Sequence, residues 1–391
     1  FTNGDNDTFP LWYNQETEGV RTDARVCNLS YLQTDWYIDQ MRRPAYDSPS
    51  LPISWTRLQY VTGTREGIPV QPNALQQVID YYKDSPEDLK QMLGDNPYEL
   101  KNIIRHWVLN DNPDLQIFPT DSIVVTVDKE AVKRSGMMIA ADSIPDVMHI
   151  SLKGKRAVYK SEMMMLEMIS QANWERPLYM STTVGPDNYG HLGDNFVQEG
   201  LACRITPFDT KQSGRTIDSE RMYNNMMNKF KYGGLKENPD IYLDETVIRM
   251  CYTHRRLFNQ LAQQLLKEGQ KDKALKVLQR AEEEIPGSIV PHEAFYGHSL
   301  ELADAWLALG HKAEAEKLLN AVGQNAREYI EWYLSLNTQR LLQSSRECLM
   351  QIYILNDIAK TWEPIDKKKA ETYRMEVNNY ASRCHQRGMS L

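Results

Sequence analysis

The pattern of apolar and polar positions divides the chain into two regions of different periodicity. Up to about residue 208, short β-rich runs alternate with stretches of helical spacing, and beyond about residue 246 the spacing is helical throughout. Alternating strands and helices predict an α/β domain, whereas uninterrupted helical spacing predicts stacked helices. We therefore predict a mixed α/β domain over residues 1–208, with a Rossmann-like sheet and helical insertions, a connector over 209–245, and an all-α tetratricopeptide-like repeat domain over 246–391.

The first 43 residues predict a strand, a helix, a second strand and a second helix. The opening residues fit the end of a strand, and the turn after them leads into a helix over 8–19, capped by Asp7 or Thr8. The run ARVCNLSYL (24–32) fits a buried strand, and TDWYIDQMRR (34–43) fits a short helix. Because the chain starts at what reads as the last residues of a strand, we expect it to be a piece of a longer protein.

The rest of the first region continues the alternation of helices and strands. Residues 44–72 are rich in proline and polar residues, and they predict a loop with an edge strand at LPISW (51–55). The other predicted elements are, in chain order, helices at NALQQVIDYY (73–82), PEDLKQML (86–93) and YELKNIIRHWVL (98–109), strands at DSIVVTVDK (121–129) and HISLKG (149–154), a helix at KSEMMMLEMISQANW (160–174), and strands at RPLYMSTTV (176–184) and GLACRITPF (200–208). The methionines of the long helix fit core filling, because Met adapts to irregular gaps.

Two stretches of the helical region resemble each other at an offset of 41 residues. LAQQLLKEGQKDKALKVL begins at Leu261 and LADAWLALGHKAEAEKLL begins at Leu302, with glycine, alanine and leucine at matching places. The glycine ends the first helix of each pair, and the small residues let two antiparallel helices approach. This pattern is typical of tetratricopeptide repeats, whose period is about 34 residues. We expect stacked helix pairs that bind a protein partner.

Composition narrows the classes of function. The net charge is −8 and the pI is about 5.6, and no run rich in Lys and Arg occurs, so we expect no nucleic-acid partner. No apolar run approaches the roughly 18–20 residues that span a bilayer. The five cysteines are widely spaced without a C-x-x-C motif, which argues against a disulfide framework or a zinc site. We interpret each of them as a small buried hydrophobe.

The opening stretch FTNGDNDTFPLWY is the first candidate site. A D-x-D pair can hold a divalent cation, because carboxylates are hard oxygen ligands, and Asp5 and Asp7 form such a pair. The same residues fit a tight turn followed by a helix, where Asp7 complements the positive helix end, and we favour this interpretation. The third alternative is contact with a polar substrate, for which the candidates are Asn3, Asp5, Asn6, Asp7, Thr8 and Trp12.

The second candidate follows the second predicted strand and consists of Asp35, Trp36 and Tyr37. Ligand sites in α/β sheets gather beyond the carboxyl ends of parallel strands, so we expect this cluster to share one crevice with the opening stretch. The loop GPDNYGHLGDN (185–195) contains a further binding candidate, Tyr189, but it lacks the spacing of a phosphate-binding motif and fits a mobile loop. No complete catalytic motif occurs, and the catalytic residues are unknown.

Four segments carry a family resemblance. They are FTNGDNDTFPLWYNQETEGVRTDARVCNLSYLQTDWYIDQM (1–41), NWERPLYMSTTVGPDNY (173–189), EGLACRITP (199–207) and MYNNMMNKFKYGGL with YLDETVIRMCY (222–252). They resemble the region that follows the last membrane helices in a large bacterial multi-pass membrane family of unknown function. That family is itself similar to protein O-mannosyltransferase-like glycosyltransferases of GT-C architecture. One departure is Asn14, where an apolar residue is expected.

The resemblance implies a location and a role. It implies the extracytoplasmic portion of a multi-pass membrane protein, on the periplasmic side of the inner membrane, with its own membrane domain as a partner. It also implies a lipid-phosphate sugar donor for the full-length enzyme, catalytic residues outside this chain, and recognition of an acceptor protein or glycan by the acidic and aromatic turn. We expect no cofactor in this chain beyond the cation alternative. Two alternatives stay open: a scaffold that braces the membrane domain, and a metal-dependent sugar transferase that uses Asp5 and Asp7.

Overall fold

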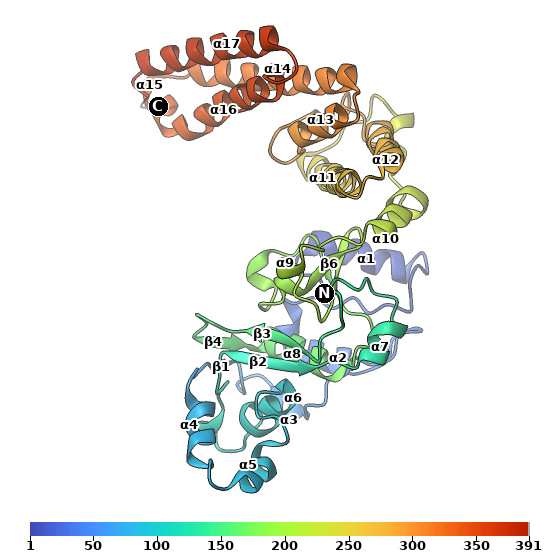
Figure 1. The fold of residues 1–391 in the computed structure, drawn as a ribbon, viewed down its shortest axis with the longest axis vertical. Helices are drawn as coiled ribbons and strands as arrows, with labels where there is room; N and C mark the ends of the chain where they lie inside the picture. Colours follow the sequence, from blue (N-terminus) through green and yellow to red (C-terminus); the bar gives the residue numbers. More distant parts are fainter. Residues whose placement is uncertain (390–391) are drawn as a thin grey trace. The chain divides into compact units, whose positions relative to one another are not determined.

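A computed structural model describes residues 1–389 of the chain (Figure 1). The chain divides into two compact units, Phe1–Asp218 and Ser219–Leu391. The first unit mixes helices with short strands, and the described part of the second is helical, which agrees with the mixed and all-α regions of the sequence. The predicted connector over 209–245 spans the division between the units.

The first unit is built from many short elements. Its helices are α1 (Asp5–Glu16), α2 (Asp35–Met41), α3 (Arg57–Tyr60), α4 (Ala74–Tyr81), α5 (Pro86–Leu93), α6 (Leu100–Ile103) with a π-helical continuation (Ile104–Val108), α7 (Lys129–Arg134), α8 (Lys160–Gln171) and α9 (Thr210–Ser213), and its 3₁₀ turns are Tyr31–Gln33, Pro113–Leu115, Pro186–Asn188 and Gly193–Asn195. Its strands are β1 (Gly67–Pro69), β2 (Ser122–Thr126), β3 (Val147–Ser151), β4 (Ala157–Tyr159), β5 (Tyr179–Ser181), β6 (Phe196–Gln198) and β7 (Ala202–Ile205). The predicted helices are therefore confirmed, with shifts of a few residues at their ends.

The strands form three small sheets instead of the predicted Rossmann-like sheet. β1 pairs with β4, β2 pairs with β3, and β7 lies between β5 and β6, and each of these pairs is antiparallel. A Rossmann-like sheet needs consecutive parallel strands joined by helical crossovers, so that part of the prediction is wrong. The strands predicted at 24–32 and 51–55 are also wrong, because these residues form turns and irregular backbone apart from a single bridge at Asn28.

The opening residues nevertheless run parallel to part of the segment 24–32, which was predicted to be the second strand. The Phe1 ammonium group donates to the carbonyl of Tyr179, the first residue of β5, at 2.6 Å. On its other side, Thr2 forms a parallel bridge with Asn28. The expected parallel pairing of the first two segments therefore exists, reduced to one bridge, and it places α1 and α2 on neighbouring stretches of backbone.

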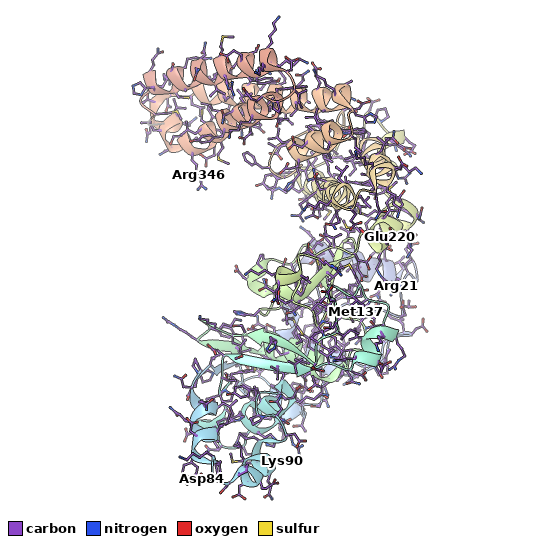
Figure 2. All side chains as sticks on the ribbon, in the orientation of Figure 1. Arg21, Asp84, Lys90, Met137, Glu220 and Arg346 are labelled. Carbon is purple, nitrogen blue, oxygen red and sulfur yellow. The ribbon has the colours of Figure 1, made fainter. Side chains whose placement is uncertain are left out.

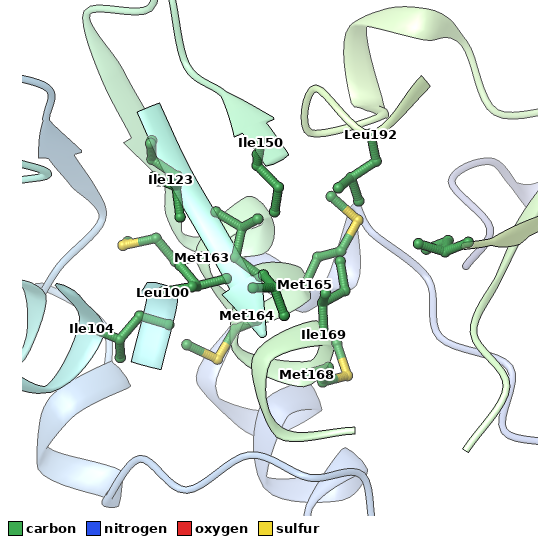
Figure 3. Packing of buried hydrophobic residues seen from close by; sticks show 14 of the residues in the cluster. Leu100, Ile104, Ile123, Ile150, Met163, Met164, Met165, Met168, Ile169 and Leu192 are labelled. Atoms are coloured by element: carbon green, nitrogen blue, oxygen red, sulfur yellow. The ribbon is translucent and has the colours of Figure 1, made fainter. Parts of the chain in front are cut away.

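α8 lies within the main core of the first unit (Figure 3). Its four methionines, Met163, Met164, Met165 and Met168, are each at most 1% exposed. They pack among side chains of α6, β2, β3 and the loop before β6, such as Leu100, Ile123, Ile150 and Leu192. Because the surrounding elements are short and not arranged as one sheet, the gaps are irregular, and flexible methionines fill such gaps well. The expectation that they fill the core is confirmed.

The helical insertion around α4 and α5 has a small core of its own. This core consists of Leu75, Leu93, Trp107 and Ile117. Asp84 and Lys90 point outward on the polar side of the insertion (Figure 2). Since its apolar residues pack with one another, the insertion keeps its shape without taking part in the main core.

The described part of the second unit consists of helices that pack in pairs. Its helices are α10 (Ser219–Asn224), continued by a π-helical turn (Asn225–Lys229), α11 (Glu245–Lys267), α12 (Lys271–Glu284), α13 (Ser299–Ala308), α14 (Lys312–Ser335), α15 (Thr338–Gln343), α16 (Ser345–Trp362) and α17 (Lys367–Gln386), with a 3₁₀ turn at Leu235–Glu237. α11 packs on α12, α13 on α14, and α16 on α17. Each partner follows its mate after a turn of a few residues, so the helices of a pair run antiparallel.

The turns inside the first two pairs have the same geometry. Gly269 and Gly310 have φ values of +75° and +83°, a left-handed conformation that glycine adopts without strain. The backbone hydrogen bond from Gln270 N to Leu265 O, 2.8 Å long, recurs 41 residues later at 2.9 Å. The prediction that each glycine ends the first helix of its pair is confirmed, whereas the tetratricopeptide assignment itself stays a prediction.

Candidate functional site

Asp7 orders the opening turn by accepting several hydrogen bonds. α1 begins at Asp5, earlier than the predicted start at residue 8, and Asp7 Oδ1 accepts from Gly4 N at 2.9 Å while Oδ2 accepts from Asn3 N at 3.2 Å. The hydroxyl of Thr183, in the segment after β5, donates to Oδ2 at 2.7 Å. A carboxylate in the first helical turn also interacts favourably with the helix dipole. In the structure Asp7 therefore fixes the turn, which is the interpretation that the sequence favoured.

A polar network lies beneath this turn. Thr8 is fully buried, and its hydroxyl lies 2.8 Å from Thr2 Oγ1 and accepts from Asn28 Nδ2 at 2.8 Å. The side chain of Asn3 accepts a hydrogen bond of 3.0 Å from Ser30 Oγ. Burying a polar group is costly unless it is paired, so these bonds fasten the turn to the segment that carries the second cluster. Asn3 and Thr8, two of the candidate contact residues, thus have partners within the chain.

Five aromatic side chains connect the two predicted clusters, and we call them the aromatic row: Phe9, Trp12, Tyr31, Trp36 and Tyr37. Ring centroids of neighbouring members are 5.5 to 6.2 Å apart. Phe9 and Trp36 are 45% and 54% exposed, whereas Tyr37 is buried. The row therefore confirms that the opening stretch and the second cluster converge, and it presents aromatic faces to solvent at both ends.

Tyr37 is the buried anchor of the aromatic row. Its hydroxyl accepts from Asn28 N at 2.9 Å, next to the bridge between Asn28 and Thr2. Burial raises the pKa of Tyr37, so the phenol stays protonated at any physiological pH. Tyr37 therefore holds the row in place and does not act as an ionised group.

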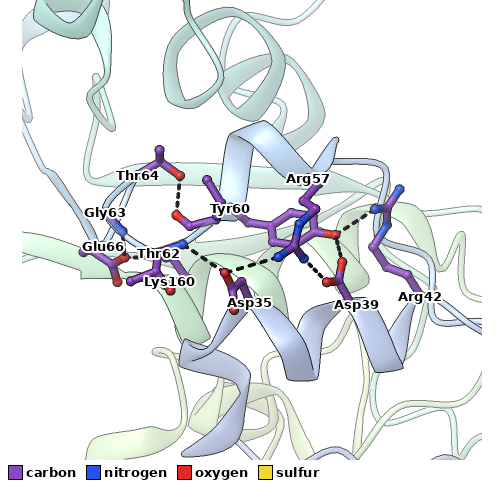
Figure 4. A network of polar contacts seen from close by, with 11 residues as sticks. Asp35, Asp39, Arg42, Arg57, Tyr60, Thr62, Gly63, Thr64, Glu66 and Lys160 are labelled. Carbon is purple, nitrogen blue, oxygen red and sulfur yellow. Dashed lines mark hydrogen bonds and ion pairs between the residues drawn. The ribbon is translucent and has the colours of Figure 1, made fainter.

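Asp35 belongs to a network of polar contacts between α2 and α3 (Figure 4). Its Oδ2 accepts from Thr62 N at 3.3 Å and lies 3.6 Å from an Arg57 nitrogen, and Arg57 also pairs with Asp39. The bond from Thr62, together with the charge of Arg57, holds the pKa of Asp35 below its ordinary value. In the structure this carboxylate fastens the loop after α3 to the start of α2, beside the exposed Trp36.

Two adjoining hollows flank the aromatic row. One, of about 500 Å³, is lined by Trp36, Arg25 and Arg43 among others. The second, of about 230 Å³, lies against Trp12, and both hollows include Arg25 and Gln40. Arg25 Nη2 donates to Gln40 O at 2.6 Å, while Nη1 is shielded from water and has no hydrogen-bond partner among residues 1–389. A buried donor without a partner is uncommon in folded proteins.

The Gly-rich loop occupies another place in the first unit. Tyr189 packs edge-on against Phe196, with ring centroids 4.9 Å apart, and the ring contacts that define the aromatic row do not include it. His191 has a φ of +63° and lines an open cleft of about 990 Å³ together with Asp194. Partial burial lowers the pKa of His191.

The cation alternative gains no further support from the geometry. Within residues 1–389, no three His, Cys, Asp or Glu side chains are grouped so that they could hold a metal ion. Asp5 and Asn6 are exposed in the first turn of α1, whereas both oxygens of Asp7 already accept hydrogen bonds within the chain. A cation bound by Asp5 and Asp7 therefore stays a prediction.

No helix among the described residues is both long and apolar enough to cross a membrane.

The structure adds three residues that the sequence did not single out. Tyr31 is the central ring of the aromatic row, but the apolar run that contains it suggested a buried strand. Thr183 bonds to Asp7 across 176 positions of sequence, a distance at which no local pattern carries a signal. Arg25 lines both hollows, and the sequence drew attention to it only as a member of the β-rich run 24–32.

Comparison with known proteins gives one match. The family described as TMEM260-associated domain 2 matches residues 1–225. The matched range contains the aromatic row, both hollows and every candidate contact residue. No curated protein matches the chain, and no solved structure matches it.

Proposed function

Because the chain belongs to the TMEM260-associated domain 2 family, we propose that it is the extracytoplasmic portion of a membrane glycosyltransferase of the protein O-mannosyltransferase-like type. In this proposal the aromatic row recognises the acceptor protein or glycan. The membrane domain supplies the catalytic residues and binds a lipid-phosphate sugar donor on the periplasmic side of the inner membrane. The sequence resemblance to GT-C enzymes supports these parts, and it follows that the chain alone is inactive.

The observation that carries the proposal is the convergence of two sequence segments on one aromatic cluster, which is exposed at Phe9 and Trp36. The first segment contributes Phe9 and Trp12 from α1, and the second contributes Tyr31, Trp36 and Tyr37 from α2 and the turn before it. Rings that pack only for stability are normally buried, but Trp36 is 54% exposed although it touches two other rings. An exposed aromatic patch beside polar hollows is typical of a binding surface.

The chemistry of the two hollows suits a sugar or a polar peptide. Aromatic faces cover the apolar C–H side of a sugar ring or a peptide side chain, while directional donors hold its oxygens. Arg25 and Arg43 supply guanidinium donors to the lining of the larger hollow. Asp39 and Gln40 line the same hollow and accept from ligand hydroxyls.

The helical unit supports a second part of the proposal, the recruitment of a protein partner. Its surface exposes large aromatic side chains on α14 and α16, including Trp332 at 54% and Tyr353 at 59%. Aromatic residues contribute strongly to protein interfaces when a partner covers them. Helix pairs with repeated turns are frequently used to display such surfaces.

The proposal is tested on the full-length protein in its membrane, with a lipid-phosphate-linked mannose as the donor. Trp36→Ala removes the most exposed ring of the aromatic row, and we expect the KM for the acceptor to rise about tenfold, because an anchor residue contributes about 1–2 kcal/mol of binding. The rate at saturating acceptor stays near that of the wild type. Asp5→Ala is measured alongside, because Asp5 is the exposed acid of the same turn.

The matched control is Tyr81→Ala, which removes an aromatic ring that is 80% exposed on α4, outside the aromatic row. It should leave both kinetic constants unchanged. If Trp36→Ala and Asp5→Ala both transfer mannose like the wild type, the aromatic row does not recognise the acceptor. The chain would then act as a scaffold that braces the membrane domain.

A further inference from the structure

Two of the five cysteines lie in contact inside the helical unit. Cys348 on α16 and Cys384 on α17 have their sulfur atoms 3.9 Å apart, and both side chains are fully buried. A disulfide has a sulfur–sulfur distance of about 2 Å, so each sulfur needs to move by only about 1 Å to reach it. The remaining cysteines belong to other elements: Cys27 and Cys203 lie in the first unit, and Cys251 lies on α11.

The pair sits at the open end of a helical hairpin. α16 and α17 are joined by the short turn between Trp362 and Lys367. Cys348 is in the first turns of α16 and Cys384 is in the last turns of α17, so the two lie at the end of the hairpin that no turn closes. Helix ends fray more readily than helix middles. A covalent link at this place would hold the end of α17 on α16.

We propose that Cys348 and Cys384 form a disulfide that closes the open end of the α16–α17 hairpin in an oxidising compartment. The co-reactant is a low-molecular-weight or protein disulfide. The thiolate of one cysteine attacks a sulfur of that disulfide, which releases one thiolate and leaves a mixed disulfide. The second cysteine thiolate then displaces the other half. The protein pair is oxidised, the external disulfide is reduced to two thiols, and these take up the two protons.

The surroundings of the pair set the conditions for this reaction. Burial raises the pKa of the Cys348 thiol to about 12 and also raises the pKa of Cys384, so neither thiol attacks readily while the hairpin is closed. The reaction therefore occurs during folding or when the end of α17 opens. Once α17 has docked, Arg387 holds it to α14 through hydrogen bonds of 2.6 and 2.7 Å to the carbonyls of Leu334 and Leu336.

The test uses the chain of residues 1–391 in two arms, one equilibrated with oxidised glutathione in the folded state and one refolded from urea in the same buffer. After denaturation, a maleimide reagent should label only three of the five cysteines. Peptide mapping should show the segments around Cys348 and Cys384 joined. The unfolding midpoint of the oxidised chain should lie roughly 5–10 °C above that of the reduced chain.

Two variants separate this link from other oxidation products. In Cys348→Ser, all of the remaining cysteines should be labelled, and oxidation should not raise the unfolding midpoint. In Cys251→Ser, two cysteines should still be protected from labelling, and oxidation should raise the midpoint as in the wild type. Helical circular dichroism shows that each variant folds. The proposal is overturned if all five cysteines stay labelled in both arms, or if mapping joins Cys384 to glutathione or to a cysteine other than Cys348.

Discussion

At the scale of single residues, buried polar groups decide the local geometry more than exposed ones do. Glu167 on α8 is fully buried, and its Oε1 accepts from Ser54 N at 2.9 Å and from Ser54 Oγ at 2.6 Å. The two residues are 113 positions apart, so this contact ties the irregular segment of 51–55 to the central helix. That segment carries the apolar residues of a strand, but it forms no strand, and the Glu167 side chain accepts the hydrogen bonds of Ser54.

The first prediction concerns this contact. Glu167→Ala should lower the free energy of unfolding by about 2 kcal/mol, because it leaves donors of Ser54 without an acceptor beside the core. Glu167→Gln keeps an acceptor oxygen in place and should cost less than about 1 kcal/mol. Urea unfolding of both variants and of the exposed control Glu175→Ala measures the difference. Equal losses in the Gln and Ala variants would contradict this role.

The second prediction is a pH dependence that arises from His254. This side chain on α11 is largely buried beside Tyr232, with ring centroids 5.5 Å apart, and burial lowers the pKa of His254 below its ordinary value. The unfolded chain therefore binds a proton at a pH where the folded chain does not, so stability falls as the pH drops below about 6.5. Above that value the imidazole is neutral in both states and contributes no pH dependence.

The measurement compares urea midpoints at pH 7.5 and pH 5.5. His254→Phe keeps a ring at this position but cannot take up a proton, so its midpoint should drop less between the two pH values than that of the wild type. His385→Phe is the control, because His385 is exposed near the end of α17. If the urea midpoint of His254→Phe falls between pH 7.5 and pH 5.5 as much as that of the wild type, the pH dependence arises from other groups.

At the scale of elements, the predicted helices all form, whereas the predicted strands form at β2, β3, β5 and β7 but not at 24–32 and 51–55, and the reason is physical. The segment PEDLKQML forms α5 with the predicted bounds, because Pro86 starts it, Gly94 follows it, and its apolar residues face one side. A helix satisfies its own backbone, so local sequence suffices to specify it. A strand needs a distant partner, and the run ARVCNLSYL obtains only one backbone bridge, at Asn28.

The candidate site shows the same division between local and distant information. Asp7 as a turn-ordering residue followed from a short-range pattern. The convergence of the two clusters was expected from parallel strands, and it occurs through a single bridge and the aromatic row. The contact from Thr183 and the place of Tyr31 in the aromatic row depend on the folded chain and were missed. Cys348 and Cys384 are 36 positions apart, and their spacing alone suggested no pairing.

The third prediction concerns the packing of the Gly-rich loop on α8. Gly190 has a φ of +57°, and a Cβ atom there would lie only 2.2 Å from Met165 Cε. In Gly190→Ala the terminal methyl of Met165 has to move, and this adds to the strain of the left-handed backbone, so we expect a loss of about 2 kcal/mol. Gly154→Ala has a φ of +84° with open space around it, so it should cost only about 1 kcal/mol, the backbone strain alone.

The two variants are compared by thermal unfolding. The difference between them isolates the contact of the loop with Met165 from the effect of the backbone conformation. Met165→Ala empties part of the core, so it is destabilising by itself. In that background Gly190→Ala should cost less than it does in the wild type, because the shorter side chain makes room for the added methyl group. If both glycine variants unfold at the same midpoint, the loop does not pack on α8 as the structure shows.

At the scale of the whole molecule, the change of periodicity along the sequence corresponds to two units that have separate cores. The first unit is organised around α8 and its methionines. In the second, Arg255 on α11 is 1% exposed, and it donates to the carbonyls of Ile285, Val290 and Pro291 at 2.8 to 3.0 Å. This one side chain fastens the segment between α12 and α13 to α11, so it is a marker for the stability of the helical unit.

The fourth prediction is that each unit unfolds on its own. Arg255→Ala should destabilise the helical unit by about 3 kcal/mol, since three carbonyls lose a charged donor, and Arg255→Lys should recover little because an ammonium group cannot reproduce the planar fork of the guanidinium. Hydrogen exchange of the full chain should accelerate in α11, α12 and α13 and stay unchanged in β2 and β3. Glu167→Ala should give the opposite pattern.

The paired design makes the result decisive, because each variant serves as the control for the other. Exchange in a structured segment reports the free energy of the opening that exposes it. If the cores are independent, a loss in one unit cannot change the opening free energy of the other. Acceleration in both units by either variant would mean that they unfold as one cooperative body. The aromatic row and the helical surface would then have to be treated as parts of one binding protein instead of two separable modules.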